Sequence, residues 1–138
     1  MLLLKGLEFK RFMEKEFMEI RKKYGLKTVE IEVLCCLACC QGADTPTDIY
    51  RRLRLNRGHI SQAIDSLYRR GYLLAEPDKD DRRIMHYSVN AEAEEVVKGI
   101  SVVRREMDLK LFDGVSEEEV QMLLEIMSKI GDNIQKSS

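Results

Sequence analysis

Six charged side chains follow one another at a single predicted turn, between the strand-like runs "YLLAE" and "RIMHYSV". The residues are Asp78, Lys79, Asp80, Asp81, Arg82 and Arg83, and their charges sum to zero. A solvated loop explains the polarity but not the arginine pair at the start of the second run. Arginine is attracted by the negative potential of a narrow DNA minor groove. A neighbouring carboxylate can pair with the guanidinium and preset its direction.

A second group of basic side chains precedes this turn. Between Ile49 and Tyr72 there are six arginines and one acid, Asp65, so this stretch carries +5 by direct count, although the whole chain carries −1. The six are Arg51, Arg52, Arg54, Arg57, Arg69 and Arg70. A basic stretch of this kind is typical of nucleic-acid binders. A solvated helix face is the alternative.

The four cysteines, Cys35, Cys36, Cys39 and Cys40, lie in one expected helix and span an arc of about 140° at 100° per residue. Clustered thiols can bind a soft metal or respond to oxidants. A single straight helix cannot surround a tetrahedral ion, however, and cysteine is often buried as a small apolar residue. We therefore expect packing, and no metal site.

The other motifs of catalysis and metal binding are missing from the sequence. His59 and His86 fall on different expected elements, without metal-ligand spacing, and there is no Gly-rich phosphate loop or Gly-x-Ser-x-Gly motif. We expect neither an enzyme nor a cofactor. The longest apolar run, residues 33–40, is far below the roughly 20 residues of a membrane span. We expect a cytoplasmic protein with no membrane partner and with free thiols.

The elements that must position these side chains are mostly helices. Periodicity and stop signals predict helices over residues 3–24, 28–40, 45–53 and 56–71, then two strands, a helix of about 20 residues after Asn90, and a last helix after Ser116. Thr45, Asn56, Asn90 and Ser116 are the expected N-caps.

Two short helices followed by a two-stranded ribbon with a charged tip indicate a winged helix-turn-helix. The fold class is therefore mainly α, with a two-stranded wing and long N- and C-terminal helices. In such a fold the second helix of the motif enters the major groove. The wing then lies over the DNA backbone and the adjacent minor groove, which is where the arginine pair at the turn would act.

The segment from Thr45 to Val97 resembles the MarR-type (multiple antibiotic resistance) transcription regulators. Three features carry the likeness: the helix end "IDSLYRRGYL", the wing "DKDDRR" with Asp81 and Arg83 on the family's Asp-x-Arg element, and a strand leading directly into a long helix. The resemblance implies that Asp81 orients Arg83 in the minor groove. The positions that it implies face DNA are Asn56, Arg57, His59, Ser61, Gln62, Arg82 and Arg83. Gly58 departs from the family, where a side chain is common.

Apolar stripes on the first and last two helices exceed what a winged-helix core can cover, so we expect a homodimer. The resemblance agrees, because the family dimerises through its terminal helices. We expect one domain over residues 1–138, with a DNA-binding lobe at about 28–90 and dimerisation helices at about 1–25 and 91–136.

The function that follows is a sequence-specific regulator, a repressor that binds a pseudo-palindromic operator in double-stranded DNA. The resemblance implies release by a small effector such as an aromatic acid or phenol. The alternative is a winged-helix protein-interaction module without specific DNA binding.

Overall fold

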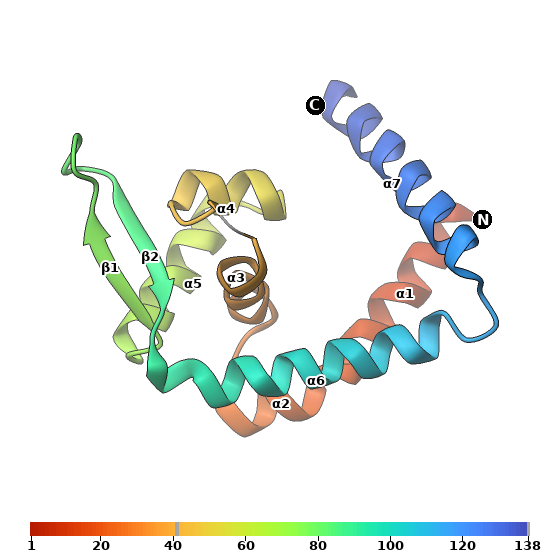
Figure 1. The fold of residues 1–138 in the computed structure, drawn as a ribbon, viewed down its shortest axis with the longest axis horizontal. Coiled ribbons are helices and arrows are strands. Elements are labelled where there is room, and N and C mark those ends of the chain that lie inside the picture. The colour runs from red at the N-terminus through yellow and green to blue at the C-terminus, as the bar shows by residue number, and fades with distance from the viewer. Residues whose placement is uncertain (41, 138) are drawn as a thin grey trace. The chain divides into compact units, whose positions relative to one another are not determined.

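The computed structural model describes residues 1–40 and 42–137 and contains helices and one strand pair (Figure 1). The elements in order are α1 (Leu2–Glu16), α2 (Met18–Tyr24), α3 (Thr28–Cys39), α4 (Pro46–Leu53), α5 (Arg57–Arg69), β1 (Leu73–Pro77), β2 (Met85–Val89), a 3-10 turn (Ala91–Ala93), α6 (Glu94–Leu111) and α7 (Glu117–Ser137). The chain divides into two compact units, Met1–Arg104 and a second that begins at Arg105. The predicted fold class, mainly α with a two-stranded wing and long terminal helices, is confirmed.

The core of the first unit lies among α3, α4 and α5. Leu34, Ile49, Ile60 and Leu67 are almost wholly excluded from solvent, one or two from each helix. Burying a side chain of this size contributes about 1.5–3 kcal/mol. The helix α3 is apolar on nearly all sides because α4, α5 and β2 all pack against it.

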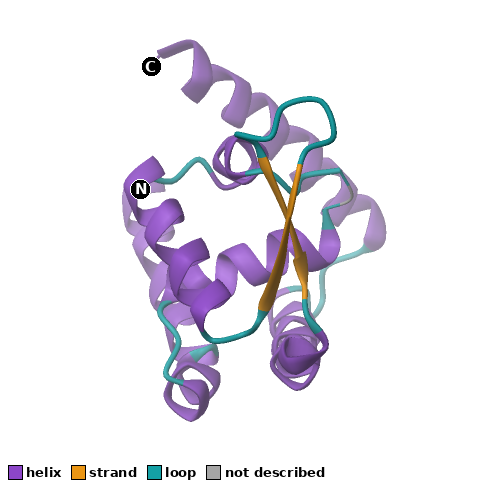
Figure 2. Ribbon diagram, turned by 90° about the vertical axis from the view of Figure 1, so that its left-hand side faces the viewer, coloured by secondary structure: helices purple, strands orange, loops and turns teal. Residues whose placement is uncertain are grey.

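The wing is an antiparallel pair in which Leu73 faces Val89 and Pro77 faces Met85 (Figure 2, orange). The second strand was expected to start at Arg83 but begins at Met85. The reason is local: the Asp81 carboxylate accepts the backbone N–H of Arg83, so this N–H is turned back toward the loop and is not used in the strand ladder.

The single N-terminal helix expected over residues 3–24 is two helices, α1 and α2, with Phe17 between them at φ −88° and ψ −1°. Phe17 and Ile20 are buried, whereas α1 buries no residue. Ile20 lies against Gly99 of α6, where an added Cβ would meet its Cδ1 at 3.4 Å. The break therefore separates a helix packed in the first unit from one that is exposed.

The expected N-caps are present. The Thr45 hydroxyl accepts the Asp48 N–H at 3.1 Å, and the Asn90 side chain accepts the Ala91 N–H at 2.8 Å. Ser116 and Glu119 form the reciprocal pair of a capping box, at 3.1 and 3.0 Å. Local hydrogen bonding thus fixes where α4, the 3-10 turn before α6, and α7 begin.

The helix α7 of the second unit has no buried residue. Its exposed apolar side chains are Met122, Leu123, Leu124, Ile126, Met127, Ile130 and Ile134. In the described parts of the chain, no helix is long and apolar enough to cross a membrane.

Candidate nucleic-acid interface

The N-terminal end of α5 is presented to solvent by a tight cap. The Asn56 carboxamide accepts the N–H groups of Gly58 at 2.8 Å and His59 at 3.3 Å. A Cβ at position 58 would lie 3.1 Å from the capping oxygen, closer than ordinary contact. Glycine, the departure from the family pattern, therefore gives the cap room to close. The predicted contact residues on this helix are all exposed: Asn56, Arg57, His59, Ser61 and Gln62.

The turn between α4 and α5 also sets the direction of Arg57. Arg54 takes a left-handed conformation, φ 54° and ψ 36°, which ends α4 and reverses the chain. The Arg57 guanidinium then lies 4.5 Å from the centre of the Tyr50 ring. A guanidinium stacked on an aromatic face loses less conformational freedom when it binds a further group. This contact between Tyr50 and Arg57 was not expected from the sequence.

The other face of α5 is anchored by a buried carboxylate. Glu30 in α3 is 2% exposed and accepts the Ser66 hydroxyl at 2.7 Å and the Lys27 N–H at 2.8 Å. Arg70 lies 3.8 Å from the same carboxylate and donates to the carbonyls of Tyr24 and Gly25. A buried carboxylate is stable only with such partners. The Glu30 carboxylate thus connects the start of α3 to the last turns of α5.

The six arginines of the basic stretch do not form one surface. Arg70 is directed to the chain at Tyr24 and Gly25, and Arg69 pairs with Asp65 at 3.9 Å on the surface. The four others, Arg51, Arg52, Arg54 and Arg57, lie in the last turn of α4, the turn and the first residue of α5, and all are exposed. Positive charge is therefore concentrated at the helix-turn-helix corner.

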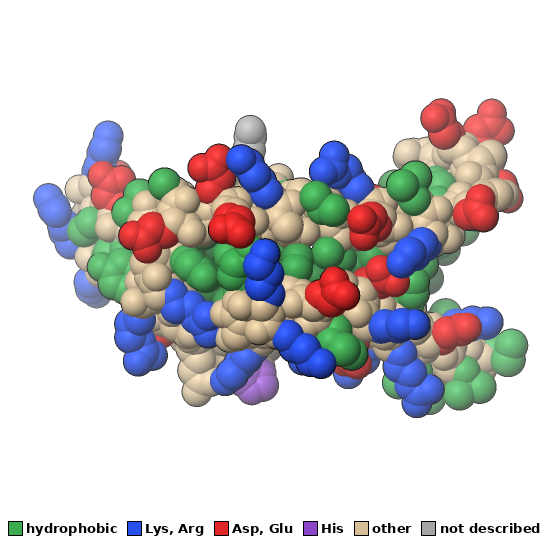
Figure 3. Space-filling view, turned by 90° about the horizontal axis from the view of Figure 1, so that it is seen from below, with side chains coloured by type: hydrophobic (Ala, Val, Ile, Leu, Met, Phe, Trp, Pro, Cys, Tyr) green, Lys and Arg blue, Asp and Glu red, His purple; other side chains and the backbone are tan. Residues whose placement is uncertain are grey.

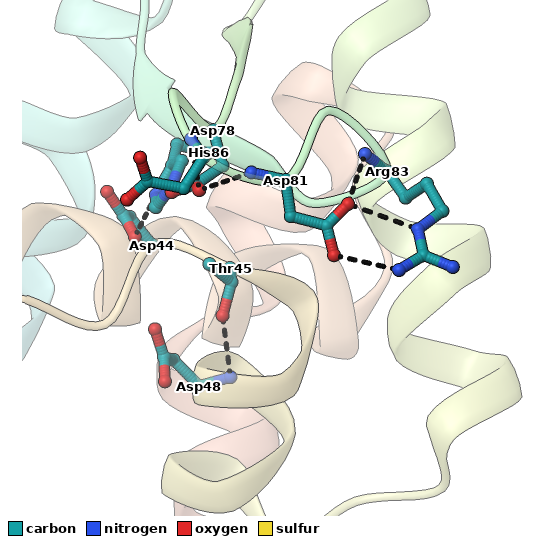
Figure 4. Close-up of polar contacts among 8 residues, drawn as sticks. Asp44, Thr45, Asp48, Asp78, Asp81, Arg83 and His86 are labelled. Atoms are coloured by element: carbon teal, nitrogen blue, oxygen red, sulfur yellow. Dashed lines mark hydrogen bonds and ion pairs between the residues drawn. The ribbon is translucent and has the colours of Figure 1, made fainter.

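The wing tip holds an arginine in a defined direction. The Arg83 Nε and Nη2 donate to the two oxygens of Asp81 at 3.1 and 3.2 Å, and the Arg83 N–H donates to Asp81 Oδ1 at 3.1 Å (Figure 4). The Arg83 side chain is nevertheless 91% exposed. The guanidinium hydrogen bonds, followed by the backbone one, lower the pKa of Asp81. Arg82 beside it is exposed as well.

A histidine links this tip to the rest of the lobe. His86 Nε2 lies 2.7 Å from Asp78 Oδ1, and Nδ1 lies 2.8 Å from Asp44 Oδ1 in the segment before α4 (Figure 4). The other oxygen of Asp78 accepts the N–H groups of Asp80 and Asp81, both at 3.0 Å. From the sequence, His86 is a candidate only for metal binding. The alternation of side chains along β2 places His86 on one face of the strand. No local sequence pattern indicates that His86 pairs with Asp44.

The cysteines differ in their environments. Cys36 is buried, Cys35 and Cys40 are half-buried, and Cys39 is exposed with its Sγ accepting from Arg104 Nη1 at 3.0 Å. Burial raises the pKa of Cys35 and of Cys36 to about 11, so neither forms a thiolate near neutral pH. Within residues 1–40 and 42–137, no group of three or more Cys, His, Asp or Glu is arranged to hold a metal ion.

One hollow lies beside α5. It has a volume of about 420 Å³ and lies between the first turn of α3 and the side of α5 that carries His59, Gln62 and Ser66. Its lining residues are Lys27, Thr28, Val29, Glu30, His59, Gln62, Ala63 and Ser66. Because His59 and Gln62 are also predicted DNA contacts, a molecule bound here would lie next to the interface.

Comparison with known proteins identifies a DNA-binding domain in the chain. The family described as "Winged helix DNA-binding domain" matches residues 26–93, which contain α3 to β2 and the 3-10 turn. The uncharacterized HTH-type transcriptional regulator YkoM of Bacillus subtilis (strain 168) is 28% identical over 110 residues, covering 80% of this chain and 71% of YkoM.

Solved structures with the same fold cover nearly the whole chain. S. aureus MepR in its DNA-binding conformation gives a TM-score of 0.87 at 17% identity, over 97% of this chain and 98% of MepR. The MepR–DNA complex gives a TM-score of 0.80 at 18% sequence identity, over 96% of this chain and 98% of MepR. A MarR protein from Peptoclostridium difficile gives a TM-score of 0.84 at 19% sequence identity, over 99% of this chain and 88% of that protein. The chain contains a winged helix DNA-binding domain and has the fold of MarR-family regulators.

In the winged-helix fold, α5 has the position of the recognition helix and the β1–β2 ribbon that of the wing. All seven residues predicted to contact DNA are exposed on these two elements or on the cap of α5, and Asp81 is paired with Arg83. That these side chains contact DNA remains a prediction.

Proposed function

We propose that the protein is a sequence-specific repressor that binds a pseudo-palindromic operator. The observation that carries this is the pair of presented arginines: Arg57 stacked on Tyr50 at the start of α5, and Arg83 held by Asp81 at the wing tip. Arg57 reads a base edge in the major groove, where arginine bidentate to guanine is the commonest specific contact. Arg83 enters the flanking minor groove. That MepR, with the same fold, is solved bound to DNA supports the proposal.

The operator is bound by a homodimer. The apolar side chains of α7 and the exposed Leu2, Leu3, Leu4 and Phe9 of α1 form apolar surface that is unusual on a monomer. Figure 3 shows, on one face, apolar side chains exposed among Lys, Arg, Asp and Glu of both signs. A symmetric partner is the commonest way to bury such surface. Two recognition helices then read half-sites about one DNA turn apart.

The repressor is released by a small effector of the aromatic acid or phenol class. The hollow beside α5 supports this, since about 420 Å³ lies within the range of roughly 300–1,000 Å³ found for ligand sites. Lys27 is the cationic residue of the lining that would face the carboxylate or phenolate. A panel of such compounds should dissociate the DNA complex of the wild type but not of Thr28→Trp, which fills the exposed end of the hollow. Equal release from both proteins would place the effector elsewhere.

The test of DNA binding is selection from a random-sequence duplex pool, followed by footprinting of the enriched duplex. We expect an enriched pseudo-palindrome and an affinity that falls steeply with salt, as counterions are released. Enrichment of no sequence at low salt would support the other reading, a winged-helix interaction module. The exposed and preset Arg83 argues against that module, because a protein-binding surface has no need of a guanidinium presented at a loop tip.

A further inference from the structure

The wing tip is connected to α4 by a continuous series of polar contacts. It runs from Asp44 through the His86 ring to Asp78, then through the Asp81 N–H to the Asp81 carboxylate, which holds Arg83. Figure 4 shows these side chains together with Thr45, the residue after Asp44 and the N-cap of α4. The strand β2 is also joined to this segment directly, because the Tyr87 N–H donates to the Asp44 carbonyl at 2.8 Å.

The two short contacts of His86 require a particular state of the ring. A neutral imidazole has one N–H donor and one acceptor nitrogen, so it can donate to only one of the two carboxylates. The other nitrogen, which has no proton, would then lie 2.7 or 2.8 Å from a carboxylate oxygen. Both atoms are acceptors, so their lone pairs would repel each other. The imidazolium donates through both nitrogens, and thus satisfies Asp44 and Asp78 at the same time.

We propose that His86 is a positioning residue for DNA binding, and that as the imidazolium it fixes the wing turn, and with it Arg83, in the orientation that enters the minor groove. This inference rests on the proposed DNA-binding function. Loss of the proton leaves one of the two links without a donor. The wing tip is then freed either from Asp44 or from Asp78, and Arg83 loses its fixed direction relative to α5.

The surrounding charges favour the protonated ring. Asp78 belongs to the wing turn, Asp44 to the segment before α4, and Glu76 is the cross-strand partner of His86 in β1. The hydrogen bond to Asp78, followed by that to Asp44, raises the pKa of His86 above its usual value. The bond to His86 in turn lowers the pKa of Asp78. A raised histidine pKa means that the link is complete at low pH and is lost as pH rises through the folded-state value.

The experiment measures affinity for the duplex recovered by selection, at fixed ionic strength, from about pH 6 to about pH 9. If the His86 pKa differs by one pH unit between free and bound protein, affinity changes about tenfold across this range. We expect wild-type affinity to fall about threefold to tenfold as pH rises. His86→Gln should bind more weakly at low pH and show no such fall.

The chain offers a matched control, because it contains only two histidines. His59→Gln lowers affinity if His59 contacts DNA but should keep the pH response of the wild type. Asp44→Asn should move the midpoint of the response to lower pH, which provides a second variant if His86→Gln folds poorly. In the free protein, the His86 ring and the backbone amides of Asp80 and Asp81 should titrate together by NMR.

The outcomes separate the inference from the function on which it rests. If specific binding is seen but His86→Gln keeps the wild-type pH response, or the wild type has none, His86 does not position the wing as the imidazolium. Amides of Asp80 and Asp81 that ignore the His86 titration would contradict the link itself. If no duplex is bound specifically at any pH, the proposed function fails and the inference fails with it.

Discussion

Replacing Glu30 tests how α5 is held against α3. The carboxylate accepts two hydrogen bonds, from the Lys27 N–H and the Ser66 hydroxyl, and a bond to a charged group contributes about 1.5–3 kcal/mol. Once the Glu30 side chain is truncated, the Lys27 N–H and the Ser66 hydroxyl can bond to water instead. The loss of stability is therefore smaller than the sum of the two hydrogen bonds. The contact with Arg70 at 3.8 Å adds about 0–1 kcal/mol, because that guanidinium is partly exposed and keeps its two carbonyl partners. Glu30→Ala should therefore lower the free energy of unfolding by about 2–4 kcal/mol.

The matched control is Glu30→Gln, which keeps the shape and both polar atoms. The Gln oxygen can accept the Lys27 N–H, and the amide can donate to Ser66 once the hydroxyl rotates. Its cost should be about 1 kcal/mol, from loss of charge alone. Urea unfolding of both variants, with the slope m unchanged, measures these values. If Glu30→Ala costs less than about 1 kcal/mol, or no more than Glu30→Gln, the carboxylate does not anchor α5 as described.

Three further predictions concern the cysteines, the oligomeric state and stability. Diamide or zinc should leave affinity for the selected duplex unchanged, since Cys35 and Cys36 have raised pKa values; a large reversible loss would indicate sensing. Sedimentation should show a dimer at micromolar concentration, and a folded monomer would contradict the dimer. The free energy of unfolding of the wild type should decline relative to His86→Gln as pH rises above about 6.5 through the raised folded-state pKa of His86, in urea titrations at several pH values. Parallel pH profiles would contradict that linkage.

Elements of the fold with a local cause were predictable. Thr45 and Asn90 cap helices through hydrogen bonds to residues one to three positions away, so spacing alone reveals them. The paired charges of the wing are two positions apart, and their contact follows from the turn. The break at Phe17 was not predicted. It interrupts the helix at a single residue, and it depends on which side chains the rest of the chain buries, which no local pattern shows.

Contacts between distant residues were missed. His86 meets Asp44 across 42 positions, and Glu30 meets Ser66 across 36, so neither pair has a sequence pattern. Arg70 counts toward positive charge in the sequence but is directed to backbone carbonyls in the structure. Charge patterning indicates the candidate interface only coarsely, because it does not distinguish an arginine that holds the fold from one that is exposed to a partner.

The most direct test of the account compares Arg57→Ala and Arg83→Ala on the selected duplex and on every single-base variant of it. Arg57→Ala should cost about 1–3 kcal/mol and relax preference at one base position per half-site. Arg83→Ala should weaken binding with less change in base preference, because the minor groove distinguishes base pairs poorly. Asp81→Ala should show a smaller loss in the same direction, and a double-mutant cycle should find Asp81 and Arg83 coupled. Wild-type affinity and base preference in both arginine variants would contradict the claim that α5 and the wing read DNA.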